Sequence, residues 1–443
     1  MKRLDDLKWE IGNSELIRLN KARIKLNEDS ELHEYQIFDS PLDPVVVNPY
    51  TLRRIRRRIK EVKKKAEAIK SRKLPQFDRI VLRDIKETVC ALESYHSYFN
   101  PEKLEDVNTK LWAVLSGLFG TFYENSVYNK LIKMFVSGID HKMHDKYSKI
   151  MSKIESHSHD TDLERIRKQA KEMVPHFIET AKSFVQETGL YDRDLEFIAE
   201  LTPATQTSSW WSPEMEQMCL DAARMNFIRI NQKEKFFGGV MYIIAIHEYA
   251  HALQEHFSKN ALPDGMNAKQ KGMNYIVQGM VSEGTACSTE KPALIWLNKN
   301  RKKLNLSKLD INLMSMLIPM YLQTKVPQIC HDLFELKGRL TQKDFDAHNE
   351  LAKISGQTRY KTDPYIFDDN PATTTFFQIN YILGSKYVSN LLTELRREYG
   401  TGFVRKNIPV IMRGMLTASA LRPNAHRQFM LKEYLPKAKN HLK

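Results

Sequence analysis

Along most of the chain, apolar residues recur at spacings of three and four, which is the pattern of an amphipathic helix. In one such segment the apolar positions are Leu52, Ile55, Ile59, Val62, Ala66 and Ile69. The pattern predicts helices over residues 52–73, 77–99, 109–135, 163–190, 241–257, 274–297 and 376–400. We therefore predict a mainly α protein whose helices pack their apolar stripes together.

Strand patterns are rare in this sequence. The best candidate is RMNFIRIN (224–231), which is short and contains aromatic and β-branched residues. The segment FGG (237–239) predicts a turn, so a small β-sheet is expected next to the helix over 241–257. Residues 203–213 are expected to be irregular, and residues 1–50 are mixed and polar. The prolines of DSPLDPVVVNPY (39–50) indicate an extended linker or a turn.

The composition is that of a globular protein. Of 443 residues, 42% are hydrophobic and 10% are aromatic, which argues against disorder. The four cysteines form no CxxC pair, which argues against a disulfide framework and a zinc ribbon. The first residues lack the apolar core of a signal peptide, and no run of eighteen apolar residues occurs. We expect a cytoplasmic protein without a membrane span.

The formal net charge of +14 is concentrated in one segment. In RRIRRRIKEVKKKAEAIKSRK (53–73), twelve Lys or Arg accompany only Glu61 and Glu67. Such a segment can attract nucleic acid, an acidic partner or an anionic membrane. However, its apolar stripe is well formed, and no aromatic residue interleaves the basic run as a single-strand platform would require. The favoured interpretation is a helix packed on the body with its basic residues in solvent, and nucleic-acid binding is the less favoured alternative.

Three polar residues interrupt the apolar helix MYIIAIHEYAHALQEHF (241–257). His247 and His251 are four residues apart, so they lie on one helix face, about 6 Å apart along the axis. Glu248 is rotated by roughly 100°, which puts a carboxylate beside a metal ion held by both histidines. There it can accept a proton from water. This HExxH pattern is that of zinc peptidases and predicts one zinc ion.

Zinc in such a site needs a third protein ligand. Glu283 in VSEGTAC (281–287) follows His251 by thirty-two residues, and its small neighbours would let two helices approach closely around an ion. Glu290 is the fallback ligand. His256 lies five residues beyond His251 and off the ligand face, with no glycine to break the helix. We therefore predict that His247, His251 and Glu283 bind the metal.

HEYAH followed by a helix that carries SEGTA resembles the gluzincin zinc metallopeptidases. Within that clan, HEYAHALQE (247–255) is similar to the HExGHALYE of the helix-rich group that includes carboxypeptidase Taq and the oligopeptidases, with Ala250 in place of glycine. The resemblance covers about residues 205–420 and is weak over the N-terminal half. It implies a helix-rich gluzincin body with a small β-sheet next to the HExxH helix.

The resemblance also implies substrate-binding residues. NFIRIN resembles the edge strand along which such enzymes align a peptide backbone, so Asn226, Phe227 and Ile228 are expected to contact substrate. A buried strand is the compatible alternative. His331, on a later helix, is a further candidate contact in the cleft, and a core histidine is its alternative.

PATTTFFQINYILGSKY (371–387) resembles the late helix in which these enzymes present a tyrosine or histidine to the developing oxyanion. Tyr381 is the candidate donor, because a phenol directed at the tetrahedral intermediate would stabilise its charge. Tyr387 is the second candidate, and a core tyrosine is the alternative interpretation. Gly384 is expected at a close helix contact.

These residues predict a zinc metallopeptidase that hydrolyses peptides. Glu248 would act as general base toward water at the zinc ion and return the proton to the leaving amine. Exopeptidase and endopeptidase activity both remain open. The resemblance slightly favours a carboxypeptidase, in which Arg413 or Arg422 would bind the terminal carboxylate. The alternative function is a non-catalytic zinc-containing adaptor that binds nucleic acid or an acidic partner through the basic helix.

The expected organisation has two regions. Residues 1–200 form an N-terminal helical region that includes the basic helix, and residues 201–443 form the catalytic region. We expect the two regions to make one continuous body that encloses a cleft. The sequence does not indicate an oligomeric state.

Overall fold

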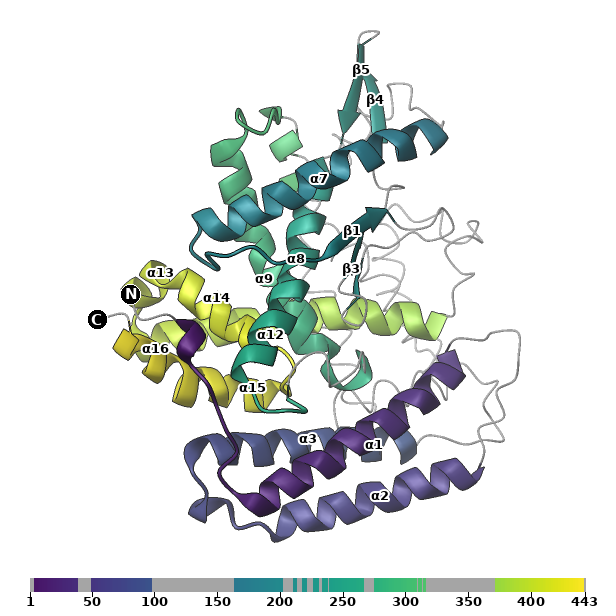
Figure 1. Ribbon diagram of the computed structural model, residues 1–443, viewed down its shortest axis with the longest axis vertical. Coiled ribbons are helices and arrows are strands. Elements are labelled where there is room, and N and C mark those ends of the chain that lie inside the picture. The colour runs from purple at the N-terminus through teal and green to yellow at the C-terminus, as the bar shows by residue number, and fades with distance from the viewer. Residues whose placement is uncertain are drawn as a thin grey trace, which may run out of the picture.

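The computed structural model describes most of the chain (Figure 1), namely residues 4–38, 49–97, 163–201, 210–212, 217–220, 226–230, 233–237, 239–266, 275–308, 310–312, 314–315 and 371–441. Within these residues the protein is mainly α, as the sequence predicts. The predicted helix over 109–135 lies outside the described residues. None of the described helices has a stretch apolar and long enough to cross a membrane.

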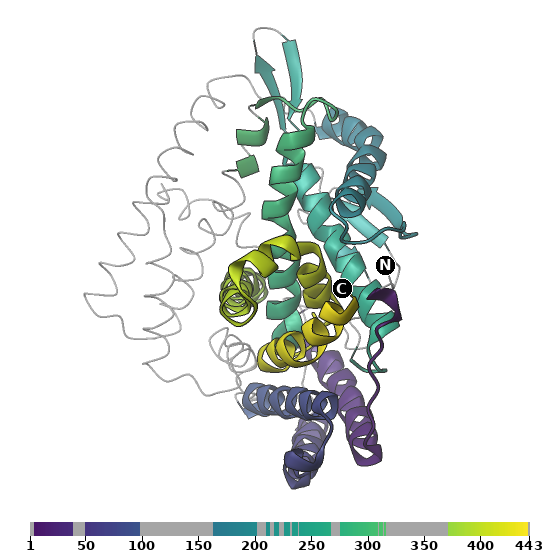
Figure 2. The same cartoon turned by 90° about the vertical axis from the view of Figure 1, so that its left-hand side faces the viewer.

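Three N-terminal helices form one layer at an end of the molecule (Figures 1 and 2). They are α1 (Ser14–Phe38), α2 (Pro49–Ala68) and α3 (Gln76–Ser97), and each contacts the other two. A short 3₁₀ turn, η1 (Leu4–Asp6), precedes the layer, and a second, η2 (Ser71–Lys73), links α2 to α3. The predicted apolar stripe is confirmed, because all six of its residues are buried, but α2 ends at Ala68 and not at residue 73, so Ile69 lies just beyond the helix.

The helix α1 corrects the expectation for residues 1–50. Its buried face combines Leu16, Leu19 and Leu26 with the polar Asn20 and Arg23. The guanidinium of Arg23 donates to the side-chain oxygen of Asn20 and to the carbonyl of Gly265. A helix that buries polar residues in this way lacks a purely apolar stripe, so periodicity alone does not reveal it.

The centre of the molecule is α8 (Gly239–Ala261), which carries the HExxH residues. It contacts α7 (Leu163–Glu187), α9 (Tyr275–Asn300) and α14 (Ile408–Thr417). Its residues from Tyr242 to Leu253 are almost all buried, so packing from several sides positions the histidines. The helices α7, α8 and α9 lie where the sequence predicts them.

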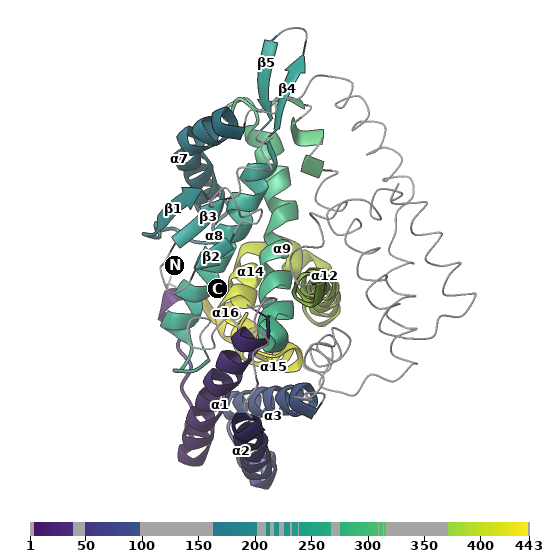
Figure 3. The same cartoon turned by 90° about the vertical axis from the view of Figure 1, so that its right-hand side faces the viewer.

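Further helices cover α9. The long α12 (Pro371–Tyr399) packs against α9 over an extensive contact (Figure 3). The chain then continues through α13 (Thr401–Lys406), α14, α15 (Pro423–Phe429), the π-helical turn η7 (Met430–Tyr434) and α16 (Leu435–His441). Since α15 also contacts α3, the C-terminal helices connect the N-terminal layer to the helices of the site.

Five short strands complete the described structure. In one sheet, of order β1-β3-β2, β1 (Ile198–Leu201) is parallel and β2 (Trp210–Ser212) antiparallel to β3 (Gln217–Leu220). Both β2 and β3 contact α8. The strand expected from NFIRIN is β4 (Asn226–Ile230), which pairs with β5 (Lys233–Phe237) in a separate antiparallel hairpin. The expectation of an irregular 203–213 is therefore wrong for Trp210–Ser212, and the sheet beside α8 is a different one from the sheet that contains NFIRIN.

A pair of glycines sets the distance between α9 and α12. A Cβ added to Gly284 would lie 2.4 Å from the backbone carbonyl carbon of Gly384, and a Cβ added to Gly384 would lie 2.3 Å from the carbonyl oxygen of Met280. Any side chain at either position would overlap the facing backbone. The expected close packing at Gly384 is thus present, and its partner helix is the one that carries Glu283.

Candidate metal centre

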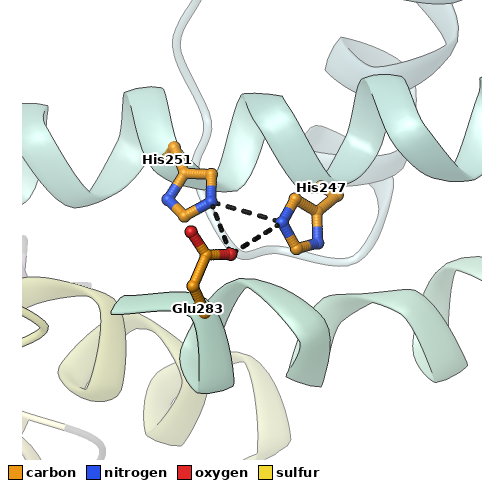
Figure 4. A group of neighbouring side chains, drawn as sticks. All are labelled: His247, His251 and Glu283. Carbon is orange, nitrogen blue, oxygen red and sulfur yellow. Dashed lines mark hydrogen bonds and ion pairs between the residues drawn. The ribbon is translucent and has the colours of Figure 1, made fainter. Parts of the chain in front are cut away.

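His247, His251 and Glu283 come together between two neighbouring helices (Figure 4). The histidines lie one turn apart on α8, and Glu283 faces them from α9. The Nε2 atoms of the two imidazoles are 3.2 Å apart, and each lies 3.4 Å from Oε2 of Glu283. His247 and Glu283 are each only 5% exposed. The structure therefore brings together the three residues that the sequence suggests as metal ligands.

The outer nitrogen of each imidazole has an acceptor of its own. Nδ1 of His247 lies 2.9 Å from a carboxylate oxygen of Glu290, which can only accept when ionised. Nδ1 of His251 lies 2.9 Å from Oε1 of Gln254. Both Nδ1 atoms therefore carry the hydrogen of the neutral ring, so both Nε2 atoms present a lone pair toward Glu283.

The amide of Gln254 is held in one orientation by α9. Its nitrogen donates to the carbonyl of Ser282 and to the hydroxyl of Thr285, both at 2.8 Å. Its oxygen accepts from the hydroxyl of Ser282, also at 2.8 Å. This network fixes the oxygen of Gln254 as the acceptor for His251. It also ties the histidine on α8 to the helix that carries Glu283.

When both rings are neutral in this tautomer, three atoms with lone pairs face one another. Within the described structure, Oε2 of Glu283 is buried and has no hydrogen bond of good geometry, only contacts of 3.4 Å with the two imidazoles. Leaving such an oxygen unsatisfied is costly. Tetrahedral ligands on bonds of 2.0–2.1 Å lie roughly 3.3–3.4 Å apart, close to the observed separations of 3.2 and 3.4 Å. The donor set and its spacing fit a small divalent cation.

The pKa shifts of Glu283 and His247 also indicate that the cluster favours a bound positive charge. Burial alone would raise the pKa of the Glu283 carboxyl, but His251 and His247 beside it hold that pKa well below its usual range. Burial alone would lower the pKa of His247, but hydrogen bonds with Cys287, Glu283 and Glu290 raise it well above its usual value. The cluster therefore requires positive charge, which protons on the imidazoles supply unless a metal ion replaces them.

Glu290 and Cys287 lie on the outer side of His247. Together with Nδ1 of His247 they form a second group of potential ligand atoms, distinct from the one that contains Glu283. A carboxylate that accepts from the Nδ1 of a ligating histidine fixes the ring and increases its basicity. We therefore assign Glu290 to orienting His247 and not to the role of third ligand that the sequence left open for it. Burial raises the pKa of the Cys287 thiol to about 12, so this cysteine stays protonated.

The remaining catalytic candidates lie around the same cluster. Glu248 follows His247 on α8 and is 6% exposed. The ring of Tyr381 on α12 stacks on the imidazole of His247, with ring centroids 5.9 Å apart. The hydroxyl of Tyr387, the second candidate, donates to the carbonyl of Pro423 at 3.0 Å and lies 2.6 Å from Nδ1 of His426. Tyr387 therefore links α12 to α15, and Tyr381 is the tyrosine next to the cluster of His247, His251 and Glu283.

Several other sequence candidates lie elsewhere. Asn226, Phe227 and Ile228 belong to β4, and His331 lies outside the described residues. Arg413 pairs with Asp5 and lies over the ring of Phe257, so these groups already engage its guanidinium.

Arg422 and His256 also make contacts outside the ligand cluster. The backbone N–H of Arg422 donates to Asp84, and the Arg422 side chain is buried. His256, which the sequence set aside as a ligand, lies 2.7 Å from the hydroxyl of Tyr191 through its Nε2. His256 therefore belongs to a different contact from the ligand cluster.

Gln254 is the residue of the site that sequence reasoning missed. It lies three residues after His251, on the same face of α8. A buried glutamine (2% exposed) between two helices must satisfy its whole amide. Its position, one turn beyond the second histidine and opposite the hydroxyl residues of SEGTA, is the signal that could have found it.

Comparisons with known proteins give little further information. No protein-family model matches the chain, and no curated protein matches it. Among solved structures, the fold is similar to the crystal structure of a "putative lipoprotein" from Colwellia psychrerythraea, with a TM-score of 0.48 and 11% sequence identity. The similarity covers 85% of this chain and 66% of that chain, so the chain spans slightly less than two thirds of that protein's length.

Proposed function

We propose that this protein is a zinc-dependent peptidase. The observation that carries the proposal is the buried cluster of His247, His251 and Glu283, whose three facing atoms are 3.2–3.4 Å apart. Imidazole and carboxylate ligands suit zinc. A purely structural zinc site is closed by four protein ligands, whereas this cluster offers three among the described residues. A three-ligand site with a glutamate after its first histidine supports hydrolysis over a structural role.

The residues of the cluster have separate roles in this proposal. His247, His251 and Glu283 would hold zinc, and Glu290 and Gln254 would keep the two imidazoles in the tautomer that binds it. When bound, zinc supplies a Lewis acid for the scissile carbonyl and lowers the pKa of water toward about 7. Its affinity then depends on both α8 and α9, because the ligands come from both helices.

Glu248 is the general base in this proposal. It directly follows His247, so its side chain leaves α8 roughly 100° around the axis from the ligand face. The side chain is buried, so little bulk water reaches this carboxylate. Glu248 takes a proton from the attacking water and passes it to the nitrogen of the leaving amine.

Tyr381 is the proposed donor to the oxyanion. Its ring is held against the imidazole of His247 by stacking, and α12, which carries it, is held against α9 by the glycine contact. A phenol hydroxyl on a rigid helix costs little reorganisation when charge develops on the carbonyl oxygen. Replacing Tyr381 by Phe should therefore reduce kcat and leave bound zinc unchanged.

The substrate is proposed to be an extended peptide. Among the described strands, β4 pairs only with β5, so its second edge can accept a further strand through backbone hydrogen bonds. Asn226, Phe227 and Ile228 would then line the substrate. The hairpin ends at Phe237, directly before α8, and His247 lies about 12 Å along that helix from Gly239. Carboxypeptidase activity is the slightly favoured mode, and internal cleavage is the other.

A peptide library tests the proposal directly. The full chain is stripped with a chelator, reloaded with one equivalent of zinc and incubated with mixed peptides that carry free or amidated carboxyl ends. Mass spectrometry then identifies the products. We expect cleavage by the reloaded protein, loss of cleavage in Glu248→Gln, and equal zinc content in both. Cleavage restricted to free carboxyl ends would identify a carboxypeptidase.

A second buried glutamate provides the matched control. Glu433 accepts from the indole N–H of Trp9 in the C-terminal helices and is 7% exposed, close to the value for Glu248. Glu433→Gln should retain both zinc and cleavage. Normal cleavage by Glu248→Gln, or no cleavage by the zinc-loaded wild type across the library, would refute the proposed function.

A further inference from the structure

The α1–α3 layer has a strongly basic surface that the proposed peptidase site does not use. In the described part of the layer, the exposed acidic residues are Glu15, Glu61 and Glu67. The exposed basic residues are several times more numerous and lie on all three helices. On α1 and α3 they are Arg18, Lys21, Lys25, Arg79, Arg83 and Lys86. The basic surface is therefore a property of the whole layer and not of one short run in the sequence.

The most outward part of this surface is a ridge along α2, formed by Arg53, Arg57, Lys60 and Lys64. These residues follow one another at spacings of four, three and four, so they share one helix face. That face is opposite the buried apolar stripe, and all four residues are exposed. Eleven residues separate the first from the last, a distance of about 16 Å along the axis.

Other basic residues of α2 hold the helix in place. Lys63 pairs with Glu93 of α3 at 2.6 Å, and Arg58 pairs with Asp29 of α1. The guanidinium of Arg56 donates to the carbonyl of His96 at 2.6 Å. These residues flank the buried stripe and explain why part of the segment is basic.

The ridge has a different set of contacts. Lys60 and Lys64 make no ion pair with a described residue, and Arg57 makes a long contact of 3.9 Å with Glu61, where both side chains are more than half exposed. Exposed pairs of this kind contribute little to stability. Arg57, Lys60 and Lys64 therefore do little to fix α2 on the body, and the guanidinium of Arg53 lies over the ring of Tyr50 on the same helix.

We propose that the ridge of α2 binds the phosphate backbone of double-stranded nucleic acid. A duplex carries one negative charge per 1.7 Å or so of its axis, so a 16 Å ridge faces about ten charges. Binding of cationic side chains to the phosphates is favourable because it releases counterions from the duplex. Arginine also matches phosphate geometry through two parallel hydrogen bonds.

Two other classes of polyanionic partner fit the ridge less well. An anionic membrane is bound most strongly when apolar side chains enter it, and the apolar face of α2 is buried against α1 and α3. A protein interface has a core depleted in charge, especially in lysine, whereas this convex ridge consists of charge alone. A positively charged face without an apolar core is typical of nucleic-acid interfaces.

Binding to short duplexes of several sequences tests the proposal. Fluorescence anisotropy of the full chain with 30-base-pair DNA duplexes, at salt concentrations from 50 to 200 mM, gives the affinity and its salt dependence. The variant Arg53→Gln/Arg57→Gln/Lys60→Gln/Lys64→Gln should bind at least tenfold more weakly at 50 mM salt. Its salt slope should fall by up to about 3.6, which is the value for four phosphate contacts. The affinity should not depend on the duplex sequence.

A variant with the same charge change elsewhere is the control. Arg396, Arg397, Arg405 and Lys406 are exposed at the end of α12 and on α13, and their replacement by Gln also lowers the net charge by four. This control should bind duplexes like the wild type. Both variants should retain zinc and peptide cleavage, so failure of this proposal and failure of the proposed peptidase are distinguishable.

Three outcomes would overturn the proposal. They are no duplex binding at 50 mM salt, equal weakening by the ridge and control variants, and binding to phosphatidylserine vesicles without binding to duplexes. Lysine acetylation footprinting of the wild type covers the case of a ridge variant that does not fold. A bound duplex should protect Lys60 and Lys64 and leave Lys406 reactive, and equal reactivity of all three lysines with and without DNA would also refute the proposal.

Discussion

Replacing Gly384 by Ala should weaken both the fold and metal binding, because Gly384 sets the distance between α9 and α12. The added Cβ would lie 2.3 Å from the carbonyl oxygen of Met280 and 2.7 Å from the backbone nitrogen of Gly284. Ordinary carbon–oxygen contacts begin at about 3.3 Å. The two helices must therefore move apart by about 1 Å, and neither contact involves a side chain that could turn away.

The expected size of the effect follows from two opposing terms. Overpacking of this kind costs about 1–3 kcal/mol, whereas alanine favours a helix over glycine by at most about 1 kcal/mol. We expect a net loss of about 1–2 kcal/mol in the free energy of unfolding. Zinc affinity should fall at least roughly tenfold, because Glu283 is adjacent to Gly284 and metal–ligand distances tolerate only about 0.2 Å.

Urea unfolding and a zinc competition titration measure the two effects. Gly402 on α13 is the matched control, since a Cβ at that helical position meets no atom within 4 Å. Gly402→Ala should leave zinc affinity unchanged and stabilise the protein by up to about 1 kcal/mol. If Gly384→Ala and Gly402→Ala change stability in the same direction, or if Gly384→Ala binds zinc like the wild type, the glycine contact does not set the helix distance.

Three further outcomes can be checked independently. Glu290→Gln should weaken zinc binding by about 10–100-fold, because the neutral amide orients His247 less firmly; unchanged affinity in a competition titration would refute the orienting role. Zinc at 100 times its Kd should stabilise the wild type by about 2.7 kcal/mol and raise its Tm. In Glu283→Gln, calorimetry should show little change in Tm on adding zinc. An equal rise in Tm in both proteins would exclude Glu283 as a ligand. Burial lowers the pKa of His426 to about 4, so the unfolded chain binds the extra proton between about pH 6.5 and 4, and stability falls as pH decreases through that window. The wild type should lose about 2 kcal/mol from this group between pH 7 and 5, and urea unfolding of His426→Gln should show a correspondingly smaller loss.

The helices that pack through a purely apolar stripe could be predicted from the sequence. The stripe of α2 is buried at every predicted position, from Leu52 to Ile69. The HExxH helix was also predictable, because a long apolar run makes a buried helix and the two histidines share its face. In both cases the residues alone determine which side of the element faces the core.

The helix α1 could not be predicted in this way, because its buried side is partly polar. Arg23 is fully buried yet satisfies part of its guanidinium with Asn20 and with the carbonyl of Gly265, which lies in the turn after α8. Such a residue is tolerated inside only when distant parts of the chain supply partners. Local periodicity contains no information about those partners.

A small sheet beside α8 was predicted, but the strands that form it were not, for a related reason. The strands β1, β2 and β3 have three or four residues each, and β1 pairs in parallel with β3. Segments of this length are at or below the shortest alternation that identifies a strand. The NFIRIN segment could be predicted as a strand because five of its residues are in β4. That prediction contains no information about which strands pack against α8.

Within the candidate site, spacing predicted the pair on α8 but only proposed the residue on α9. Two residues one turn apart must share a face, whereas the approach of Glu283 depends on how α8 and α9 cross. For the same reason, the sequence could not decide between Glu283 and Glu290 as the third ligand. Both are acidic residues on α9, seven residues apart, and both face His247. Only the three-dimensional arrangement shows that Glu283 meets Nε2 and that Glu290 meets Nδ1.

The residues of SEGTA (282–286) make contacts in two directions because α9 lies between α8 and α12. Ser282 and Thr285 bond the amide of Gln254 on α8, and Glu283 between them faces both histidines. Gly284 faces the opposite way and admits the backbone of α12. Consecutive residues of one turn therefore connect the ligands of α8 to the helix that carries Tyr381. A displacement of α12 would be felt at Glu283 through the backbone contact of Gly384 with Gly284, because no side chain at that contact can absorb it.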